Sequence, residues 1–464
     1  DYQLSVEASS FKKWTTEFTL RAGDITVVDP SLEVGSVDVV VEVSGAAPVI
    51  ATESSEIADV KDSLRIQQLP LNGRSITSLF DLTPGVQGGG NARVNGLKVG
   101  SMDITLDGMS MVDRFGGGMA RVQPGLDTIA EFRVETTGSG AQFSRPATVT
   151  LVTKSGTNQF HGSAFETFRN NGGGLVARQR QSFSEAPLLI RNEFGVSAGG
   201  PVFIPKFYDG RNRTFWFVAY EASRQREQSI SNGNTVPTLA LWEGDFSGAV
   251  DNNGNLSRLY DPLTTGVDGR RTPFLGNIIP KNRQNPVFGV LKSVTHMPTN
   301  NVNPYIGGNM DEIYADKNDI GNWTFKGDQV ISDRNSLSFR FTRSDRHSAV
   351  TGGVFGTPRA DMTNGFGTSR GDYFIYNGTA RWTSTLTPTF LSELMVAAHH
   401  SPKSSGTLAD NTDWQAQLGF PNPFQAKGWP SLYAGAFGWD GDNRKEEILS
   451  AVVVEENLTW IKSN

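Results

Sequence analysis

The chain has no cysteine among its 464 residues. Disulfide bonds, thiolate catalysis and zinc–thiolate sites are therefore excluded. It has only five histidines, and their spacing does not match that of metal ligands. It also lacks an apolar run long enough for a membrane-spanning helix. These absences still allow a membrane β-barrel, because only alternate residues of a barrel strand face lipid.

An excess of positive charge is also missing. The formal net charge is −6, which argues against a general nucleic-acid binder. Aromatic residues make up 10% of the chain, more than is typical of disordered proteins. The length exceeds one ordinary core, so we expect two or more domains. Both ends of the sequence are strand-like, so we expect a piece of a longer protein.

Enzyme signatures are weak. Residues 367–371 match the G-x-S-x-G pattern, but a nucleophile elbow needs a strand before it and a helix after it, and this stretch lies in a glycine-rich segment. The triple-glycine runs at 88–90 and 116–118 lack the helix of a dinucleotide site. Residues 251–255 resemble a calcium loop but have Leu256 where glycine is required. We expect no enzymatic activity, no cofactor and no metal site.

The first third of the chain alternates between strand-like and helix-like stretches. Short bursts at 2–6, 17–20, 25–28 and 32–34 predict the last strands of a small β-sandwich. Residues 49–155 have mixed α/β character. Helices are predicted at 62–69 and 75–82, each stopped before a proline. Strands are predicted at 104–106, 131–136 and 149–153.

From residue 160 onward the pattern is strands and loops. Links between the strands alternate between short (201–213, 331–336, 384–389) and long (172–190, 223–321, 344–375, 399–447). This asymmetry is typical of outer-membrane barrels, with periplasmic turns at one end and extracellular loops at the other. A soluble sandwich has no reason to keep it. Strands are predicted at 160–170, 191–199, 214–222, 322–330, 337–343, 376–383, 390–398 and 448–460.

The clearest of these strands is 337–343. Leu337, Phe339 and Phe341 share one face, and Ser338, Arg340 and Thr342 share the other. In a barrel the polar face would meet a wet lumen, whereas in a sandwich it would meet outside water. The strand alone does not choose between these readings. An aromatic girdle would suit a barrel, and its candidates are Trp216, Tyr220, Trp323, Tyr376, Trp382 and Trp460.

A series of motifs carries a family resemblance. They are LPLNGRS (69–75), LTPGV (82–86), VNG (94–96), ITLDGM (104–109), LDTIAEFRVETTGSGAQFSR (126–145) and LVTKSGTNQFHGSAFETFRNN (151–171). In this order they resemble the plug of TonB-dependent receptors, specifically the Oar-like branch with an N-terminal carboxypeptidase-regulatory-like domain. The resemblance continues through RNEFGVSAGGPV (191–202), RTFWFVAYEASR (213–224) and RTPFLGNIIP (271–280).

The resemblance implies a mainly β fold in four parts. These are the end of a regulatory-like sandwich (1–36), a TonB-box-like segment and linker (37–48), a mixed α/β plug (49–155) and the N-terminal part of a transmembrane antiparallel β-barrel (156–464). Barrels of roughly 22 strands are wide enough to need a plugged lumen. The implied location is the bacterial outer membrane, with the sandwich and box in the periplasm.

The resemblance also implies partners. TonB, reaching from the inner membrane, would pull on an extended segment by β-strand addition. Asp38-Val39-Val40-Val41-Glu42-Val43-Ser44 is the candidate, and its alternative role is the final strand of the sandwich. Membrane lipid and an unknown extracellular ligand are the other expected partners. Nucleic acid is not expected.

Two groups of residues are assigned to the plug. The plug motif residues are Asn72, Gly73, Arg74, Asp107, Gly108, Glu131, Arg133, Glu135 and Arg145. Arg74, Arg133, Glu135 and Arg145 are expected to face charged barrel walls and to hold the plug by ion pairs. Lys154, Ser155, Gly156, Thr157 and Asn158 are expected to form the junction between plug and barrel. If so, Leu151 and Phe165 should not share one core.

The favoured function is a TonB-dependent receptor or transporter that captures a ligand at extracellular loops and plug and imports it as the plug rearranges. A non-transporting adhesin or secretion-associated barrel of the same family is the alternative. A soluble β-sandwich carbohydrate enzyme is a third reading, which would require paired carboxylates in a cleft. No convincing pair is present.

Overall fold

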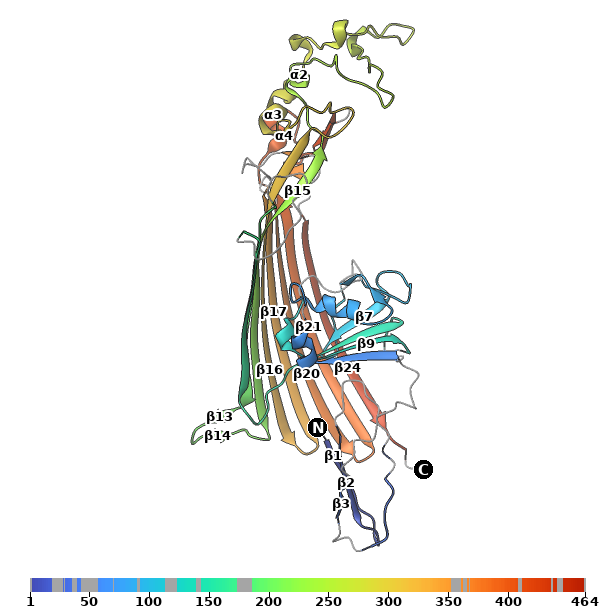
Figure 1. Cartoon of the computed structure of the whole chain (residues 1–464), viewed down its shortest axis with the longest axis vertical. Coiled ribbons are helices and arrows are strands. Elements are labelled where there is room, and N and C mark those ends of the chain that lie inside the picture. The colour runs from blue at the N-terminus through green and yellow to red at the C-terminus, as the bar shows by residue number, and fades with distance from the viewer. Residues whose placement is uncertain are drawn as a thin grey trace.

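The computed structural model describes residues 2–18, 28, 30–35, 40–42, 57–69, 71–89, 92–112, 123–138, 143–172, 186–351, 360–361, 365–366, 368–407, 411–434, 437–439 and 445–462. Three bodies of sheet follow one another along the chain (Figure 1). They are a small N-terminal sheet, a compact mixed domain and one sheet of long strands. No helix in these ranges is long and apolar enough to cross a membrane.

The largest body is an eight-stranded antiparallel sheet, which we call the wall. Neighbouring strands follow chain order throughout. Such an up-and-down order needs only hairpins and no crossover. Its strands are β11 (His161–Asn170), β12 (Leu189–Pro201), β15 (Thr214–Asn234), β16 (Met310–Ser332), β17 (Asn335–Thr351), β20 (Thr368–Thr387), β21 (Phe390–Thr407) and β24 (Lys445–Trp460).

Connections at one end of the wall are short. Only two residues separate β16 from β17, and two separate β20 from β21. The third connection at this end, between β12 and β15, carries a small hairpin of β13 (Phe203–Ile204) and β14 (Tyr208–Asp209). The predicted alternation of short and long links is therefore present.

The predicted strand ends were wrong at the other end of the wall, where the long connections lie. The sequence indicated that strand structure stops near residue 222 and resumes near 322, whereas β15 continues to Asn234 and β16 begins at Met310. The added segments include RQREQ (224–228) and have no apolar alternation. They remain strands because each continues the backbone ladder with its neighbour, with Ile230 opposite Ile313.

Side chains on the wall alternate as a barrel requires. Phe339 is 49% exposed whereas its neighbour Arg340 is 1% exposed. The register places Tyr220 beside Trp323, and their ring centroids are 4.4 Å apart on the outward face. Trp382 and Trp460 are also exposed. This distribution favours the barrel reading of the 337–343 strand over the sandwich reading.

The mixed domain, which we call the plug, lies against one face of the wall (Figure 1). Its five-stranded sheet has the order β4-β9-β10-β7-β8. β10 pairs with β7 in parallel and with β9 antiparallel. The strands are β4 (Ile57–Asp62), β7 (Met102–Leu106), β8 (Met109–Ser110), β9 (Ile129–Thr137) and β10 (Ala147–Thr153), with a small pair β5 (Val86–Gln87) and β6 (Arg93–Val94) beside them.

Both predicted plug helices are present. In α1 (Ser63–Gln68) the Asp62 side chain accepts a hydrogen bond from the Arg65 amide as N-cap. The second is a 3-10 helix, η1 (Ile76–Leu82), and another, η3 (Leu126–Thr128), precedes β9. Phe80 of η1 stacks on Phe132 of β9 at 5.5 Å in the plug core. Leu151 is fully buried in the same core, whereas Phe165 belongs to β11 of the wall.

The N-terminal sheet has three strands. β1 (Tyr2–Val6) and β2 (Lys13–Phe18) form a hairpin, and β3 (Val40–Glu42) adds to β2 in parallel. The predicted strand at 32–34 was wrong, because Val34 makes only an isolated bridge with Phe11. Most of the predicted strand at 25–28 lies outside the described residues.

The two longest connections meet at the far end of the wall, above the plug in Figure 1. One joins β15 to β16 and carries α2 (Leu239–Trp242), η4 (Pro262–Thr264), η5 (Leu275–Asn277), η6 (Lys281–Arg283) and α3 (Val287–Val294). The other joins β21 to β24 and carries α4 (Trp414–Gln417), β22 (Leu432–Ala434) and β23 (Phe437–Trp439). They share an apolar core of Trp242, Leu291, Leu418, Trp429, Phe437 and Trp439. We call this unit the loop cap.

Candidate functional site

The contact between plug and wall holds most of the predicted plug residues. One part is the turn between β7 and β8. Asp107 and Gly108 both have positive φ, 47° and 85°, as a two-residue hairpin of this kind requires. The Asp107 carboxylate accepts hydrogen bonds from the Thr153 amide at 3.0 Å and from the Thr153 hydroxyl at 2.8 Å. The turn is therefore tied to the end of β10.

The same carboxylate forms an ion pair across to the wall. Arg340 Nε of β17 lies 2.7 Å from Asp107 Oδ2. Arg340 also donates to Asn377 Oδ1 at 2.7 Å and to the Leu106 carbonyl at 3.4 Å. A buried guanidinium needs such partners, because an unpaired charge away from water is costly.

A second wall arginine reaches the turn from β20. Arg381 Nη2 donates to the Asp107 carbonyl at 3.2 Å. A Cβ on Gly108 would lie 2.5 Å from that nitrogen and 3.2 Å from Met395 Sδ of β21. Gly108 is therefore needed for its backbone conformation and for the close approach of the wall. Together these contacts join one plug turn to β17, β20 and β21.

The Asn72-Gly73-Arg74 loop contacts the opposite part of the wall. Asn72 Oδ1 accepts from Arg169 Nη1 at 2.8 Å and also from Arg191. The Arg74 guanidinium lies 3.8 Å from the centre of the Phe165 ring, within cation–π range. These contacts attach the plug to β11 and β12.

Arg74 also approaches an acidic side chain. Its Nη2 is 3.9 Å from Glu221 Oε2 of β15. Arg74 thus faces an acidic side chain of the wall. Glu221 additionally accepts from the Asp127 amide at 2.7 Å, so one wall carboxylate contacts two plug segments.

Asp127 in η3 is a centre of contacts that the sequence analysis did not single out. Its carboxylate accepts from Gln67 Nε2 at 2.9 Å, from Lys154 Nζ at 3.2 Å and from the Ser163 hydroxyl of β11. Burial works against its charge, but the Ser163 hydroxyl and Lys154 ammonium hold the pKa of the Asp127 carboxyl below its usual range. Asp127 therefore joins plug, junction and wall as an anion.

The predicted junction runs close along the wall. A Cβ on Gly156 would lie 2.4 Å from the Trp216 carbonyl and 2.6 Å from the Gly200 carbonyl, so only glycine fits. Asn158 Nδ2 donates to Asn212 Oδ1 at 2.5 Å, and its own Oδ1 accepts from the Asn212 amide at 2.6 Å. Thr157 bonds locally to the Gln159 carbonyl, and Ser155 lies between Lys154 and Gly156. The junction is thus fixed to the β12–β15 connection.

Three of the four residues expected to face the wall form ion pairs within the plug. Arg133 Nε lies 2.7 Å from Glu135 Oε1 within β9, and Thr148 donates to the other oxygen of Glu135 at 2.9 Å. Arg145 lies 3.5 Å from Asp103. The Thr148 hydrogen bond joins β10 to β9, and the Arg145 pair joins the segment before β10 to β7. Glu131 is in β9, opposite Asp62 and Val152.

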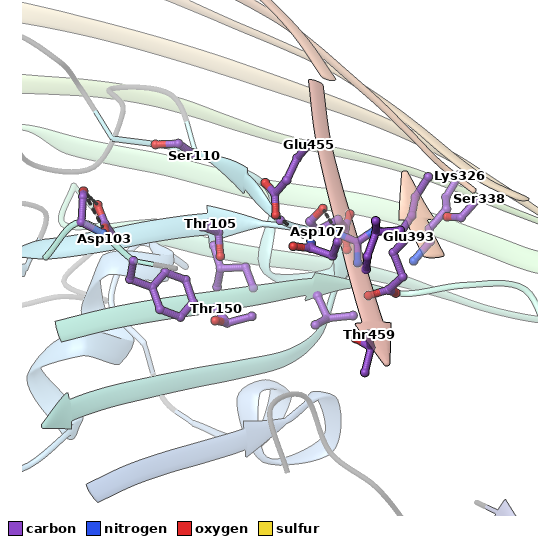
Figure 2. Close-up of a pocket in the computed structure, with 18 residues that line it drawn as sticks. Asp103, Thr105, Asp107, Ser110, Thr150, Lys326, Ser338, Glu393, Glu455 and Thr459 are labelled. Carbon is purple, nitrogen blue, oxygen red and sulfur yellow. Dashed lines mark hydrogen bonds between the residues drawn. The ribbon is translucent and has the colours of Figure 1, made fainter. Parts of the chain in front are cut away.

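A cavity of about 970 Å³ lies beside the Asp107–Gly108 turn (Figure 2). The plug supplies one side of it, including Asp103, Thr105 and Thr150. β21 and β24 supply another, including Glu393 and Glu455. Lys326 of β16 lies at the same cavity and donates to the Thr153 carbonyl at 3.0 Å. Both sides of the cavity carry polar or charged side chains among apolar ones, and water can occupy it.

Within the described ranges, no group of three or more histidine and carboxylate side chains could hold a metal ion. The arrangement offers ion pairs, hydrogen bonds and a polar cavity between two bodies. It therefore suits reversible contact between plug and wall.

Comparison with known protein families identifies the type of structure to which the wall belongs. Residues 152–464, more than half of the chain, match the family described as "Outer membrane beta barrel domain". The chain belongs to this family. It is accordingly a protein of the bacterial outer membrane, and its wall is barrel structure.

A curated relative carries the name of the branch that the plug motifs resemble. The family member is 25% identical over 300 residues to the TonB-dependent transporter Oar of Myxococcus xanthus, a match that covers 60% of this chain and 27% of that protein. The resemblance to Oar-like TonB-dependent receptors is thereby confirmed. The chain spans about a quarter of the length of this relative.

Solved structures of siderophore receptors are also similar. The ferric enterobactin receptor PfeA of Pseudomonas aeruginosa is 10% identical with a TM-score of 0.41, over 86% of this chain and 45% of that one. BauA, the ferric preacinetobactin receptor of Acinetobacter baumannii, is 10% identical with a TM-score of 0.38, over 88% and 55%.

The box candidate of this family member is only partly described. Val40, Val41 and Glu42 form β3, the strand that pairs in parallel with Lys13–Thr15 of β2. Asp38, Val39, Val43 and Ser44 lie outside the described residues. Its assignment as a TonB box stays a prediction.

Proposed function

We propose that this chain is part of a TonB-dependent receptor that imports an extracellular ligand when TonB rearranges the plug. The observation that supports this most is the contact between plug and wall. It consists of ion pairs and hydrogen bonds, such as Asp107 with Arg340 and Asn72 with Arg169. Polar contacts of this kind can be exchanged for water when force is applied, whereas an apolar interface would resist separation.

TonB would act on residues 38–44. A segment that already pairs in a sheet can add to the sheet of a partner by the same backbone hydrogen bonds. β3 is a three-residue edge strand beside β2, so few bonds oppose its release. The division into sandwich end (1–36), box and linker (37–48), plug (49–155) and barrel (156–464) is part of this proposal.

The ligand would be met first by the loop cap, at the end of the wall opposite the short turns. The cap lies on the extracellular side in this orientation. It has its own apolar core, which would give the two loops a defined shape before binding. The mechanism requires no catalytic step and no cofactor.

Deletion of residues 38–44 in the full-length protein tests the proposal. Compounds held by living cells are compared by mass spectrometry, with surface-bound material separated from material inside the cell. We expect the deletion to abolish internal accumulation and to leave surface binding intact. Unchanged accumulation would rule out the box assignment.

A non-transporting adhesin or secretion-associated barrel is the alternative. Exposed apolar side chains on the loop cap favour it, notably Leu263 at 78% and Leu275 at 94% exposure, because such side chains suit contact with another surface. Dissipating the proton gradient separates the two functions. Transport would collapse, whereas adhesion would continue.

A further inference from the structure

The plug is attached to the two parts of the wall in different ways. Toward β11, β12 and β15 its described contacts are spread over three segments: the 72–74 loop, η3 and the junction 154–158. The junction is also a covalent link. Toward β17, β20 and β21 the described contacts gather at one hairpin, residues 106–111.

We propose that the first attachment is a hinge and the second a latch. This rests on the proposed function, because TonB supplies the movement. When the plug is pulled, the latch at Asp107 opens first and the plug turns about η3 and the junction. The cavity of Figure 2 then widens into the passage, between the plug and β21 and β24.

Three observations support the assignment of the Asp107 turn as the latch. Asp107 is the shared partner of Arg340 in the wall and of Thr153 at the end of β10. Thr153 is followed directly by the junction, so a displacement of β10 is passed to Asp107 without intervening loops. The cavity begins at the same turn, since Asp107 and Gly108 line it.

The hinge side is built to stay closed. Backbone atoms of Trp216 and Gly200 leave no room for a side chain at Gly156. A Cβ at Gly125 would lie 2.0 Å from Glu221 Oε1, so η3 is equally close to β15. Separation here would break several neighbouring contacts at once, whereas separation at the latch breaks those of one hairpin.

The polar lining of the cavity supports its role as a passage. Thr105 and Thr150 of the plug lie across from Glu393 and Glu455 of the wall (Figure 2). Water can replace the contacts of such side chains as the cavity widens. Apolar residues such as Val152 and Leu458 also line the cavity, whereas Val149 of the same plug strand is buried in the plug core.

Single cysteines test this, since the chain has none of its own. Thr150→Cys places a thiol on the cavity side of the plug, and Ser75→Cys places one on the hinge side, beside Arg74. Both are introduced into the full-length protein. Cells are treated from outside with a membrane-impermeant maleimide too large for general porins, with and without a protonophore.

We expect energised cells to label Thr150→Cys at least about 5-fold faster than de-energised cells, and Ser75→Cys at an unchanged rate. An equal increase at both sites would overturn the hinge, since the plug would then leave as one body. An increase at Ser75→Cys alone would reverse hinge and latch. Both results leave TonB-driven movement standing.

The same experiment distinguishes failure of the latch from failure of the proposed function. If energy changes labelling at neither site, the plug does not move and both proposals fall. If labelling of Thr150→Cys rises but deletion of 38–44 does not remove the rise, the latch stands and the box assignment fails. Loss of the rise in the deletion supports both.

Discussion

Arg340 of the wall and Asp107 of the plug form a buried ion pair with 2.7 Å between Nε and Oδ2. The two residues lie in different bodies and are far apart in sequence. Arg340 is 1% exposed and Asp107 has a second set of bonds to Thr153. The pair therefore connects β17 to the plug strand that leads into the barrel.

Replacing one partner should loosen the plug. Arg340→Met leaves the half-buried Asp107 carboxylate without its cation, and loss of one partner of a buried pair costs up to about 3–5 kcal/mol. The expected result is faster proteolysis of the plug in outer-membrane vesicles. Asp107→Asn combined with Arg340→Met should recover part of the loss, because no unpaired charge remains.

Arg211→Gln provides the comparison for that variant. Arg211 pairs with Asp209 in the β13–β14 connection, where both side chains are exposed. Exposed ion pairs contribute little to folding stability, so the rate of plug proteolysis should not change. Equal sensitivity of both arginine variants would show that the Asp107 pair has no special role.

Gly156 should tolerate no side chain. Gly156→Ala would press a methyl group against two backbone carbonyls of the wall, and overpacking of this kind costs about 1–3 kcal/mol or more. We expect a lower midpoint in thermal unfolding of the purified protein. Gly248→Ala has no atom within 4 Å of the new methyl and should leave the midpoint unchanged.

The Asp127 network should weaken in acid. Because the folded-state pKa of Asp127 is lowered, its contribution is fully present above the unfolded pKa of about 3.9. That contribution is lost as pH falls through the lower folded-state pKa. Protease protection of the junction, measured from pH 7 downward, should therefore decrease in this window.

Asp127→Asn identifies the group responsible for that pH dependence. The variant keeps the size of the side chain but cannot carry the charge. Its junction should be less protected at neutral pH and should lose less protection on acidification. A pH profile identical to that of the original chain would assign the effect to other carboxyls.

The loop cap should fold as one unit. Trp439 is 1% exposed, and its indole donates to Thr295 Oγ1 of the other loop at 2.9 Å. Trp439→Ala should cost about 3–5 kcal/mol locally and expose both loops to protease. Phe424 is 90% exposed, so Phe424→Ala should change neither the local stability nor the protease sensitivity of the loops. Cleavage confined to one loop would contradict a shared core.

The sequence predicts the wall well and its contacts poorly. Alternation and the lengths of the links locate all eight wall strands, because both follow from a barrel in a membrane. The polar extensions of β15 and β16 carry no such signal, so the end of β15 was predicted too early and the start of β16 too late. The links that form the cap were predicted only as long loops, because their tryptophans are spread over two distant segments that only the fold brings together.

The candidate site shows the same limit. Asp107, Gly108 and Asn72 belong to motifs that can be recognised in the plug sequence. Arg340 could be assigned to the inward face of its strand, but its partner depends on where the plug rests. The sequence gives no sign that Glu221 and Asp127 meet, because each contact joins elements that are adjacent only in three dimensions.

The most direct test of the account is contact between residues 38–44 and TonB in living cells. Val41→Cys in the full-length protein is paired with single cysteines along the periplasmic domain of TonB. We predict disulfide-linked adducts that form at alternate TonB positions, as strand addition requires, and that are absent with a cysteine at Leu64 of the plug. No adduct from any position between 38 and 44 would contradict the account.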